Sequence, residues 1–439
     1  MQLTSQTSIR NTVTALTATL LGVKGAAAAG PLRTDASILL YTETDRVTTG
    51  EGALSFHKQI DSKYSLGLRL TYDALTGASP NGATPSSKLQ TFTGPSGETT
   101  TRIQPGQIPL DPTFRDNRFA ASADLSRLLD RLTTVSLGSH LSFESDYSSL
   151  GFNAGITRDF FQKNTTLGLS GSFSHDIVNP NGGVPIGLSV VPPPDTTGGD
   201  DDDDGGEGDD DDGRGSGIGS DTKNVVDFVL GLSQVVNRST VVRMNYSFDR
   251  ASGYQNDPYK IVSVVQSESG PEPGDATEYL YESRPDARSK HAVFGEVLKS
   301  LGRHTLDLSY RYFWDTWGIK SNTAEVSFAW RTKRGMAIEP HLRWYHQSRA
   351  DFYHPFLVQG DQLPAYASAD SRLADFDAYT VGLKYSFPAY HDSRISLSGE
   401  YYFQRGDQSP PEAFGTLRNY DLFPDMNAFM LRVGLAHGF

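Results

Sequence analysis

The residues best suited to chemistry in this sequence are the carboxylates of one acidic stretch. Twelve acids lie between Asp195 and Asp221, against the single base Arg214. Part of the run matches the start of an EF-hand calcium loop, through Asp200, Asp202, Asp204 and Gly205, with Asp211 where that loop has its glutamate. Asp209 is a further candidate ligand in the same run. A run of consecutive aspartates among glycines produces such a match almost automatically. We therefore expect a disordered, solvated surface loop over 195–221, with weak binding of divalent cations as the alternative.

A second group of candidate ligands lies at the end of the predicted strand over 336–348. His346, Asp351 and His354 lie close together in the sequence, among several aromatic residues. Two neutral imidazoles and a carboxylate could bind a transition metal. Histidines at the end of a strand are more often hydrogen-bonded interface residues, and this second interpretation is the one we favour.

Catalytic motifs are absent from the sequence. It contains no G-x-S-x-G nucleophile elbow and no H-E-x-x-H zinc motif. The chain has no cysteine, which excludes a thiol nucleophile, a zinc-thiolate site and covalent haem. The net charge of −13 comes mostly from the acidic stretch, and no basic stripe is present to bind nucleic acid. We predict neither an enzyme nor a cofactor.

The elements that must position these residues show a period of two. In the segment 241–249, Val242, Met244, Tyr246 and Phe248 alternate with polar residues. A strand places such residues on one face, whereas a helix would scatter them around its circumference. About sixteen segments of this kind follow residue 35. They span 36–47, 51–59, 64–75, 117–128, 133–145, 148–160, 165–176, 223–236, 239–250, 287–300, 304–314, 319–331, 336–348, 376–387, 393–404 and 426–439.

The connections between these segments differ in length at the two ends. All the long connections fall at one end, and the connections at the other end are tight turns such as 60–63 and 302–303. The long ones span 76–116, 177–222, 251–286, 349–375 and 405–425. Outer-membrane barrels have short periplasmic turns and long surface loops. The sequence thus predicts an all-β fold, a transmembrane antiparallel β-barrel of about sixteen strands. We place Trp314, Trp317 and Trp330 in its aromatic girdles.

Both ends of the chain are consistent with export to the cell outer membrane. Residues 1–29 contain a basic start, a modest apolar stretch and a run of alanines, as in a cleavable signal peptide. The last strand ends at Phe439, and a terminal aromatic residue of this kind resembles the signal read by the barrel assembly machinery. We expect residues 30–439 to form the barrel domain, with the assembly machinery and outer-membrane lipid as partners.

The same alternation predicts which charged residues face the lumen. They include Arg69, Asp73, Asp249, Arg311, Glu325, His341, Arg343 and Glu400. Both signs occur in similar number, whereas a selective ion channel usually shows one dominant sign. Two arrangements fit this composition. Ion pairs could cross-link and plug the lumen, or opposite walls of opposite charge could line an aqueous pore.

Several unusual segments resemble a family of bacterial outer-membrane barrels known only as a domain of unknown function. They are DALTGASPNGA at 73–83, GYQNDPYK at 253–260, YESRPD at 281–286, WDTWG at 314–318 and the run 339–356. The resemblance implies the barrel fold and export, and carries over no catalytic residue. It also implies extracytoplasmic redox proteins as partners, because members of the family occur with them. The aspartate run is a departure from the family pattern.

Three functions remain open on this basis. The leading hypothesis is a non-enzymatic channel or scaffold of the outer membrane, without an assigned substrate. The second is a plugged barrel that binds partners or divalent cations through its loops. The third, an outer-membrane enzyme, lacks any supporting motif.

Overall fold

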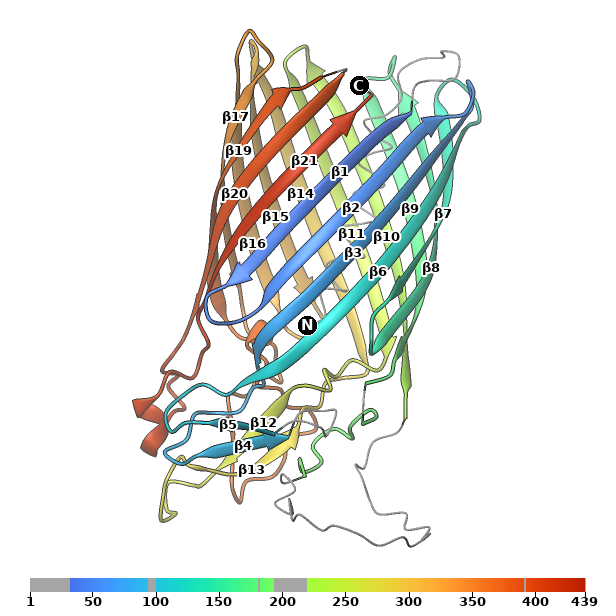
Figure 1. Ribbon diagram of the computed structural model, residues 1–439. Coiled ribbons are helices and arrows are strands. Elements are labelled where there is room, and N and C mark those ends of the chain that lie inside the picture. The colour runs from blue at the N-terminus through green and yellow to red at the C-terminus, as the bar shows by residue number, and fades with distance from the viewer. Residues whose placement is uncertain (1–31, 94–99, 181, 193–218, 391, 439) are drawn as a thin grey trace, which may run out of the picture.

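Sixteen antiparallel strands close into one barrel, which confirms the fold predicted from the sequence (Figure 1). The computed structural model describes residues 32–93, 100–180, 182–192, 219–390 and 392–438. The predicted signal peptide and most of the acidic stretch lie outside these residues. Strand β1 pairs with β21, so the sheet has no free edge and every strand has two neighbours.

The strands that form the wall agree with the predicted segments. They are β1 (Arg33–Glu43), β2 (Thr48–Gln59), β3 (Tyr64–Pro80), β6 (Leu110–Leu128), β7 (Thr133–Phe143), β8 (Tyr147–Phe160), β9 (Thr165–Val178), β10 (Asp221–Asn237), β11 (Thr240–Gly253), β14 (Ala287–Leu301), β15 (His304–Asp315), β16 (Lys320–Arg331), β17 (Ala337–Gln347), β19 (Phe376–Pro388), β20 (Ser393–Gly406) and β21 (Met426–His437). The largest differences are at β3 and β6, which pair beyond the predicted ends. Their extensions lack side-chain alternation, and backbone pairing does not require it.

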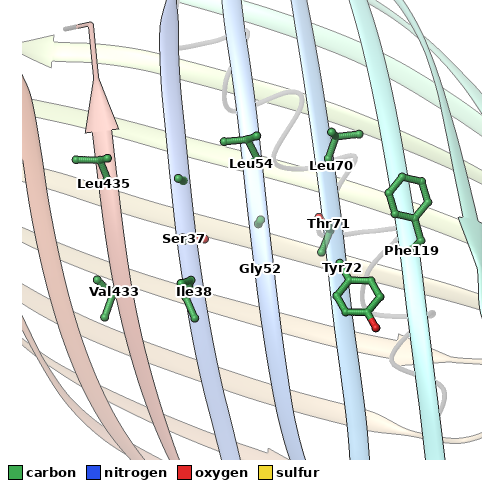
Figure 2. Close-up of a pocket in the computed structure, with 12 residues that line it drawn as sticks. Ser37, Ile38, Gly52, Leu54, Leu70, Thr71, Tyr72, Phe119, Val433 and Leu435 are labelled. Carbon is green, nitrogen blue, oxygen red and sulfur yellow. The ribbon is translucent and has the colours of Figure 1, made fainter.

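Apolar side chains cover the outside of the wall. Ile38 is 68% exposed and Leu137 is 65% exposed, and similar residues recur at every second position of the strands. Such a surface is stable when it contacts hydrocarbon instead of water. Figure 2 shows part of it, where Gly52 leaves a shallow groove between Ile38 and Tyr72. The groove results from missing side chains, because a Cβ at Gly52 would meet no atom within 4 Å.

The two ends of the barrel differ as the sequence predicted. Seven short turns connect the strands at one end, at 60–63, 129–132, 161–164, 238–239, 302–303, 332–336 and 389–392. All five long connections lie at the other end, together with the shorter links 44–47, 144–146 and 316–319 (Figure 1). We call these the short-turn end and the loop end.

The long connections fold into a layer that we call the loop cap, made of the described parts of 81–109, 179–220, 254–286, 348–375 and 407–425. It contains a three-stranded sheet of β13 (Ala276–Tyr281), β12 (Ile261–Val265) and β18 (Leu357–Val358), and the hairpin β4 (Gln90–Thr93) with β5 (Thr100–Ile103). Two short 3-10 helices, η1 (Ser371–Leu373) and η2 (Gly415–Asn419), complete it. Among the described residues, no helix is long and apolar enough to cross a membrane.

The loop cap has apolar cores of its own. Val262, Leu280 and Leu357 pack together in one cluster, and Phe414 and Leu417 belong to a second. The sequence did not predict these strands, because they are short and pair across loops that are distant along the chain.

Trp317 corrects one expectation from the sequence. It is only 3% exposed, and it packs against Phe352 at a ring-centroid distance of 5.0 Å and under the Arg288 guanidinium at 4.2 Å. The placement in a lipid-facing girdle was wrong because the connection 348–375 folds over the turn that carries this residue. Trp330, in contrast, is 61% exposed on the outer face near a short turn.

Candidate functional site

Four of the charged residues predicted for the lumen meet deep inside the barrel. The Arg343 guanidinium lies 3.0 Å from the Glu325 carboxylate, on the neighbouring strand β16. The His341 ring lies 3.8 Å from Glu325 and 3.8 Å from Glu400 of β20. We call these four residues the lumen cluster. Their side chains are 25% to 40% exposed, so water reaches them.

The charged side chains of the lumen form ion pairs along the inner surface of the wall. Asp73 of β3 pairs with Arg118 of the adjacent β6 at 2.7 Å. Glu400 reaches His341 by lying over Gly382 of the intervening strand β19, where a Cβ would come within 2.8 Å of its side chain. These contacts, and those of the lumen cluster, join strands that are one or two positions apart. They neutralise charge at the wall without bridging the lumen.

Nearer the loop end, the charged residues are buried. Asp227, Asp249, Lys290 and Asp315 lie side by side in register on β10, β11, β14 and β15. Asp249 is 1% exposed, and its carboxylate lies 3.2 Å from the Lys290 amine. Arg288 neutralises Asp315 through a hydrogen-bonded ion pair. Burial of this kind requires that something covers the inner side of the wall.

The covering extends beyond these four strands. We call the buried inward-facing residues at the loop end the mouth ring. Beyond the charged row, it includes Glu43, Ser321, Thr323, Gln347, Ala378, Gln404 and Ala428, from β1, β16, β17, β19, β20 and β21. The loop cap thus packs onto the mouth, while the side chains of the lumen cluster below it remain accessible to water.

Buried ion pairs hold the loop cap together. The Arg284 guanidinium lies 2.7 Å from Glu282 and 2.8 Å from Asp370, and Arg372 lies 2.5 Å from both Asp370 and Asp257. Burial by itself would raise the pKa of Asp370, but the two arginines more than offset this and lower the pKa below its ordinary value. These five residues, which we call the cap network, link the connections 254–286 and 348–375.

The sequence predicted none of the cap network as a site. A signal was nevertheless present, because Asp257 lies in the segment 253–260 and Glu282 and Arg284 lie in 281–286, both of which carried the family resemblance. The unusual motifs therefore mark the residues that fold the cap. No spacing rule could pair Arg284 with Asp370, which is 86 residues away.

The other residues predicted for the lumen lie as follows. Arg69 is exposed on the face of β3 opposite Leu68 and Leu70. The guanidinium of Arg311, on β15, lies 5.5 Å from the centre of the Phe313 ring. Asp73 belongs to the wall pair with Arg118, and Asp249 belongs to the buried row of the mouth ring.

The predicted metal ligands do not assemble in the described structure. Asp200, Asp202, Asp204, Asp209 and Asp211 lie outside the described residues. His346 lies 3.3 Å from Asp377 and stacks on Trp344 on the outer face. Asp351 lies against Gly318, and His354 bonds through its backbone amide to Ser368. In the described chain, these three do not form a group with ligand atoms within 4.8 Å of one another.

A different acidic group does come together at the loop end. Ligand oxygens of Asp116, Glu144 and Asp146 lie within 4.8 Å of one another. Two of the carboxylates already accept hydrogen bonds, Asp116 from the Ser145 hydroxyl at 2.8 Å and Asp146 from the Tyr259 hydroxyl at 2.5 Å. Burial and the neighbouring Asp116 raise the pKa of Glu144 to about 7. The Tyr259 bond ties the loop cap to the rim of the barrel.

The fold and the site together define a membrane-type β-barrel whose mouth is covered by its own loops. The chain matches the family described as "Protein of unknown function (DUF3570)" over residues 9–437, and it belongs to that family. This confirms the resemblance seen in the sequence. No curated protein matches the chain.

Several solved structures are similar to this chain at low sequence identity. The CymD monoaromatic hydrocarbon channel is 9% identical with a TM-score of 0.40, covering 96% of this chain and 92% of its own. OccK2 (OpdF) of Pseudomonas aeruginosa in complex with glucuronate is 10% identical with a TM-score of 0.40, over 95% and 100%. A mutant ferric enterobactin receptor (PfeA) of the same organism, in complex with enterobactin, is 10% identical with a TM-score of 0.43, over 94% and 60%. At this level, the similarity concerns the barrel architecture only.

Proposed function

We propose that this protein is an outer-membrane channel whose mouth is closed by the loop cap in the described conformation. The observation that carries the proposal is the boundary between the buried mouth ring and the exposed lumen cluster. Asp249 in the mouth ring is 1% exposed, whereas the Glu325 side chain deeper in the lumen is 40% exposed. A lumen plugged along its length would bury both levels.

The outer surface supports a location in the outer membrane. Its large apolar side chains face away from the barrel and need hydrocarbon around them. Short turns at one end and long loops at the other favour the orientation in which the loop cap faces the cell exterior. The lumen cluster would then be reached from the periplasm.

The wall contacts favour conduction over a permanent plug. The pairs, such as Asp73 with Arg118, join strands that are one or two positions apart, which leaves their charges at the wall of the lumen. Charged groups at such a wall select ions and polar solutes. The proposal therefore assigns polar solutes as the class of substrate, and it includes no catalytic role.

A permanently closed barrel that binds a partner through its loops is the second candidate. The cap network favours it, because Glu282, Arg284 and Asp370 are almost completely buried. Removing one partner from a buried ion pair costs about 3–5 kcal/mol, so a cap built in this way resists opening.

Single-channel recording of the refolded protein, before and after loosening of the cap network, distinguishes the two candidates. Arg284→Met leaves Glu282 and Asp370 without their shared guanidinium, so the cap should detach more often. We expect rare openings in the wild type and openings about tenfold more frequent in Arg284→Met. A loss of several kcal/mol in the cap network would allow a larger increase than this.

Arg349→Met is the matched control. The Arg349 side chain is 58% exposed and pairs with Glu412 on the surface of the cap. Exposed pairs contribute about 0–1 kcal/mol, so this variant should behave as the wild type. Heat-modifiable migration must show that all three barrels are folded, and faster amide exchange in β12 must show that the cap of Arg284→Met is loose. A loose cap on a folded barrel that stays silent would contradict the channel and favour the second candidate.

A further inference from the structure

The short-turn end carries an excess of positive charge. Its seven turns contain seven exposed bases: Lys63, Arg131, Lys163, Arg238, Arg303, Lys333 and Arg334. They contain three acids, Asp61, Asp130 and Asp392. The bases occupy six of the seven turns, so they surround the barrel instead of gathering on one side.

Two of the acidic side chains have a structural role in their turns. The Asp61 carboxylate accepts hydrogen bonds from the backbone amides of Lys63 at 2.7 Å and Tyr64 at 2.8 Å, which lowers the pKa of this group. Asp130 accepts from the amides of Leu132 at 2.7 Å and Thr133 at 2.9 Å. Both carboxylates therefore shape their turns, as aspartate often does.

The bases have no comparable structural role. Lys163 lies 3.6 Å from Asp159. In the described part of the chain, the other six bases form no salt bridge and no side-chain hydrogen bond. Their charges are therefore available to a partner outside the barrel.

Exposed apolar side chains lie at all seven turns. They are Ile60, Leu129, Phe161, Val236, Leu301, Trp330 and Tyr390, each in a turn or within two residues of one. Tyr390 is 82% exposed and Phe161 is 77% exposed, which is unfavourable in water. Apolar anchors next to basic side chains are typical of surfaces that lie at the headgroup level of a membrane.

The loop end has the opposite charge. The connection 254–286 alone contains seven acids against Lys260 and Arg284. The molecule is therefore electrically polar along the barrel axis, and the basic end is the one that enters the periplasmic leaflet in the proposed orientation.

We propose that the short-turn end binds the phosphates of anionic phospholipids in the periplasmic leaflet. This inference rests on the proposed outer-membrane orientation. A ring of bases and apolar anchors around the whole circumference matches an annulus of lipid, because every turn then meets a headgroup. An acidic protein would contact only one side of such a ring. Each base near an anionic surface adds to the attraction, and salt weakens it.

Fluorescence quenching of Trp330 by brominated lipids tests the proposal. Trp330 lies two residues before the turn 332–336, which carries Lys333 and Arg334, and it faces outward. The full chain is refolded into mixed vesicles of brominated phosphatidylglycerol and phosphatidylcholine, and then into the reverse combination. The signal lost in Trp330→Phe isolates this tryptophan from the other three.

We expect phosphatidylglycerol to associate about threefold more strongly than phosphatidylcholine at low salt, and the ratio to fall towards one at about 0.5 M salt. The double variant Lys333→Gln and Arg334→Gln should lower the ratio in the same way. Lys320→Gln is the matched control, because it removes one exposed base at the loop end.

A ratio of one at low salt would overturn the proposal. It would favour an acidic protein as the partner of the basic turns. A ratio above one that neither salt nor the double variant changes would overturn it as well. Conductance recorded on the same preparation keeps the result separate from that of the proposed channel, because lipid preference does not require an open mouth.

Discussion

At the scale of the residue, Glu144 lies beside the contact that attaches the loop cap to the rim. Burial and Asp116 raise the pKa of its carboxyl to about 7, and Asp146 beside it accepts the Tyr259 hydroxyl of the cap. The unfolded chain loses the Glu144 proton near pH 4.5, whereas the folded protein keeps it until about pH 7. Its contribution to stability is therefore complete below pH 4.5 and is lost as the pH rises through 7.

We predict that the wild-type cap is less stable at about pH 8 than at about pH 5, by up to about 2 kcal/mol. Glu144→Gln should remove most of this difference, because glutamine does not titrate. The free energy is measured from urea unfolding followed by the fluorescence of Trp317, which the cap buries. Glu268→Gln, at an exposed position of the cap, is the control. An unchanged pH dependence in Glu144→Gln would show that other groups are responsible.

At the scale of the element, the end of β11 depends on a glycine. Gly253 has a φ of +102°, and a Cβ there would lie 2.3 Å from the Thr222 carbonyl oxygen of β10. Gly302, in a short turn, has a φ of +68° with no atom within 4 Å of a Cβ. Both positions disfavour side chains through their backbone conformation, but only Gly253 also has a backbone neighbour in the way.

We predict that Gly302→Ala lowers the free energy of unfolding by about 1 kcal/mol and Gly253→Ala by more than about 2 kcal/mol. In Gly253→Ala, the β10–β11 pair must shift to relieve the clash. Urea unfolding of the barrels refolded in vesicles measures both values. Equal losses in the two variants would mean that backbone conformation alone matters at Gly253.

At the scale of the whole molecule, the charges of the lumen cluster should determine which ions pass. Glu325 and Glu400 flank His341 at 3.8 Å, and both are accessible to water. Neutralising them leaves Arg343 as the nearest fixed charge, which favours anions.

We predict that Glu325→Gln with Glu400→Gln, in the Arg284→Met background, lowers the cation-to-anion permeability ratio about threefold. The reversal potential in a potassium chloride gradient gives this ratio. Glu268→Gln in the same background should leave it unchanged, because Glu268 lies on the cap and not in the lumen. A ratio insensitive to both lumen carboxylates would place the selective region elsewhere.

The sequence by itself determined the wall of this protein. Alternation such as Tyr379, Val381 and Leu383 is a local property of each strand, so all sixteen strands could be predicted without knowledge of their neighbours. The lengths of the connections then determined which end carries the loops. The same alternation grouped Glu325, His341 and Arg343 on one face, although it could not bring Glu400 to them from β20.

Only the tertiary structure decided what covers the mouth. Arg284 and Asp370 are 86 residues apart, and Tyr259 lies 113 residues from the Asp146 that accepts its hydroxyl. Such contacts form only after the barrel closes and brings distant loops to one rim. Trp317 shows the same limit, because its position in the sequence was consistent with a girdle until the loop 348–375 covered it. Local patterns therefore predict strands and faces, whereas the burial of a loop residue depends on the loops that pack against it.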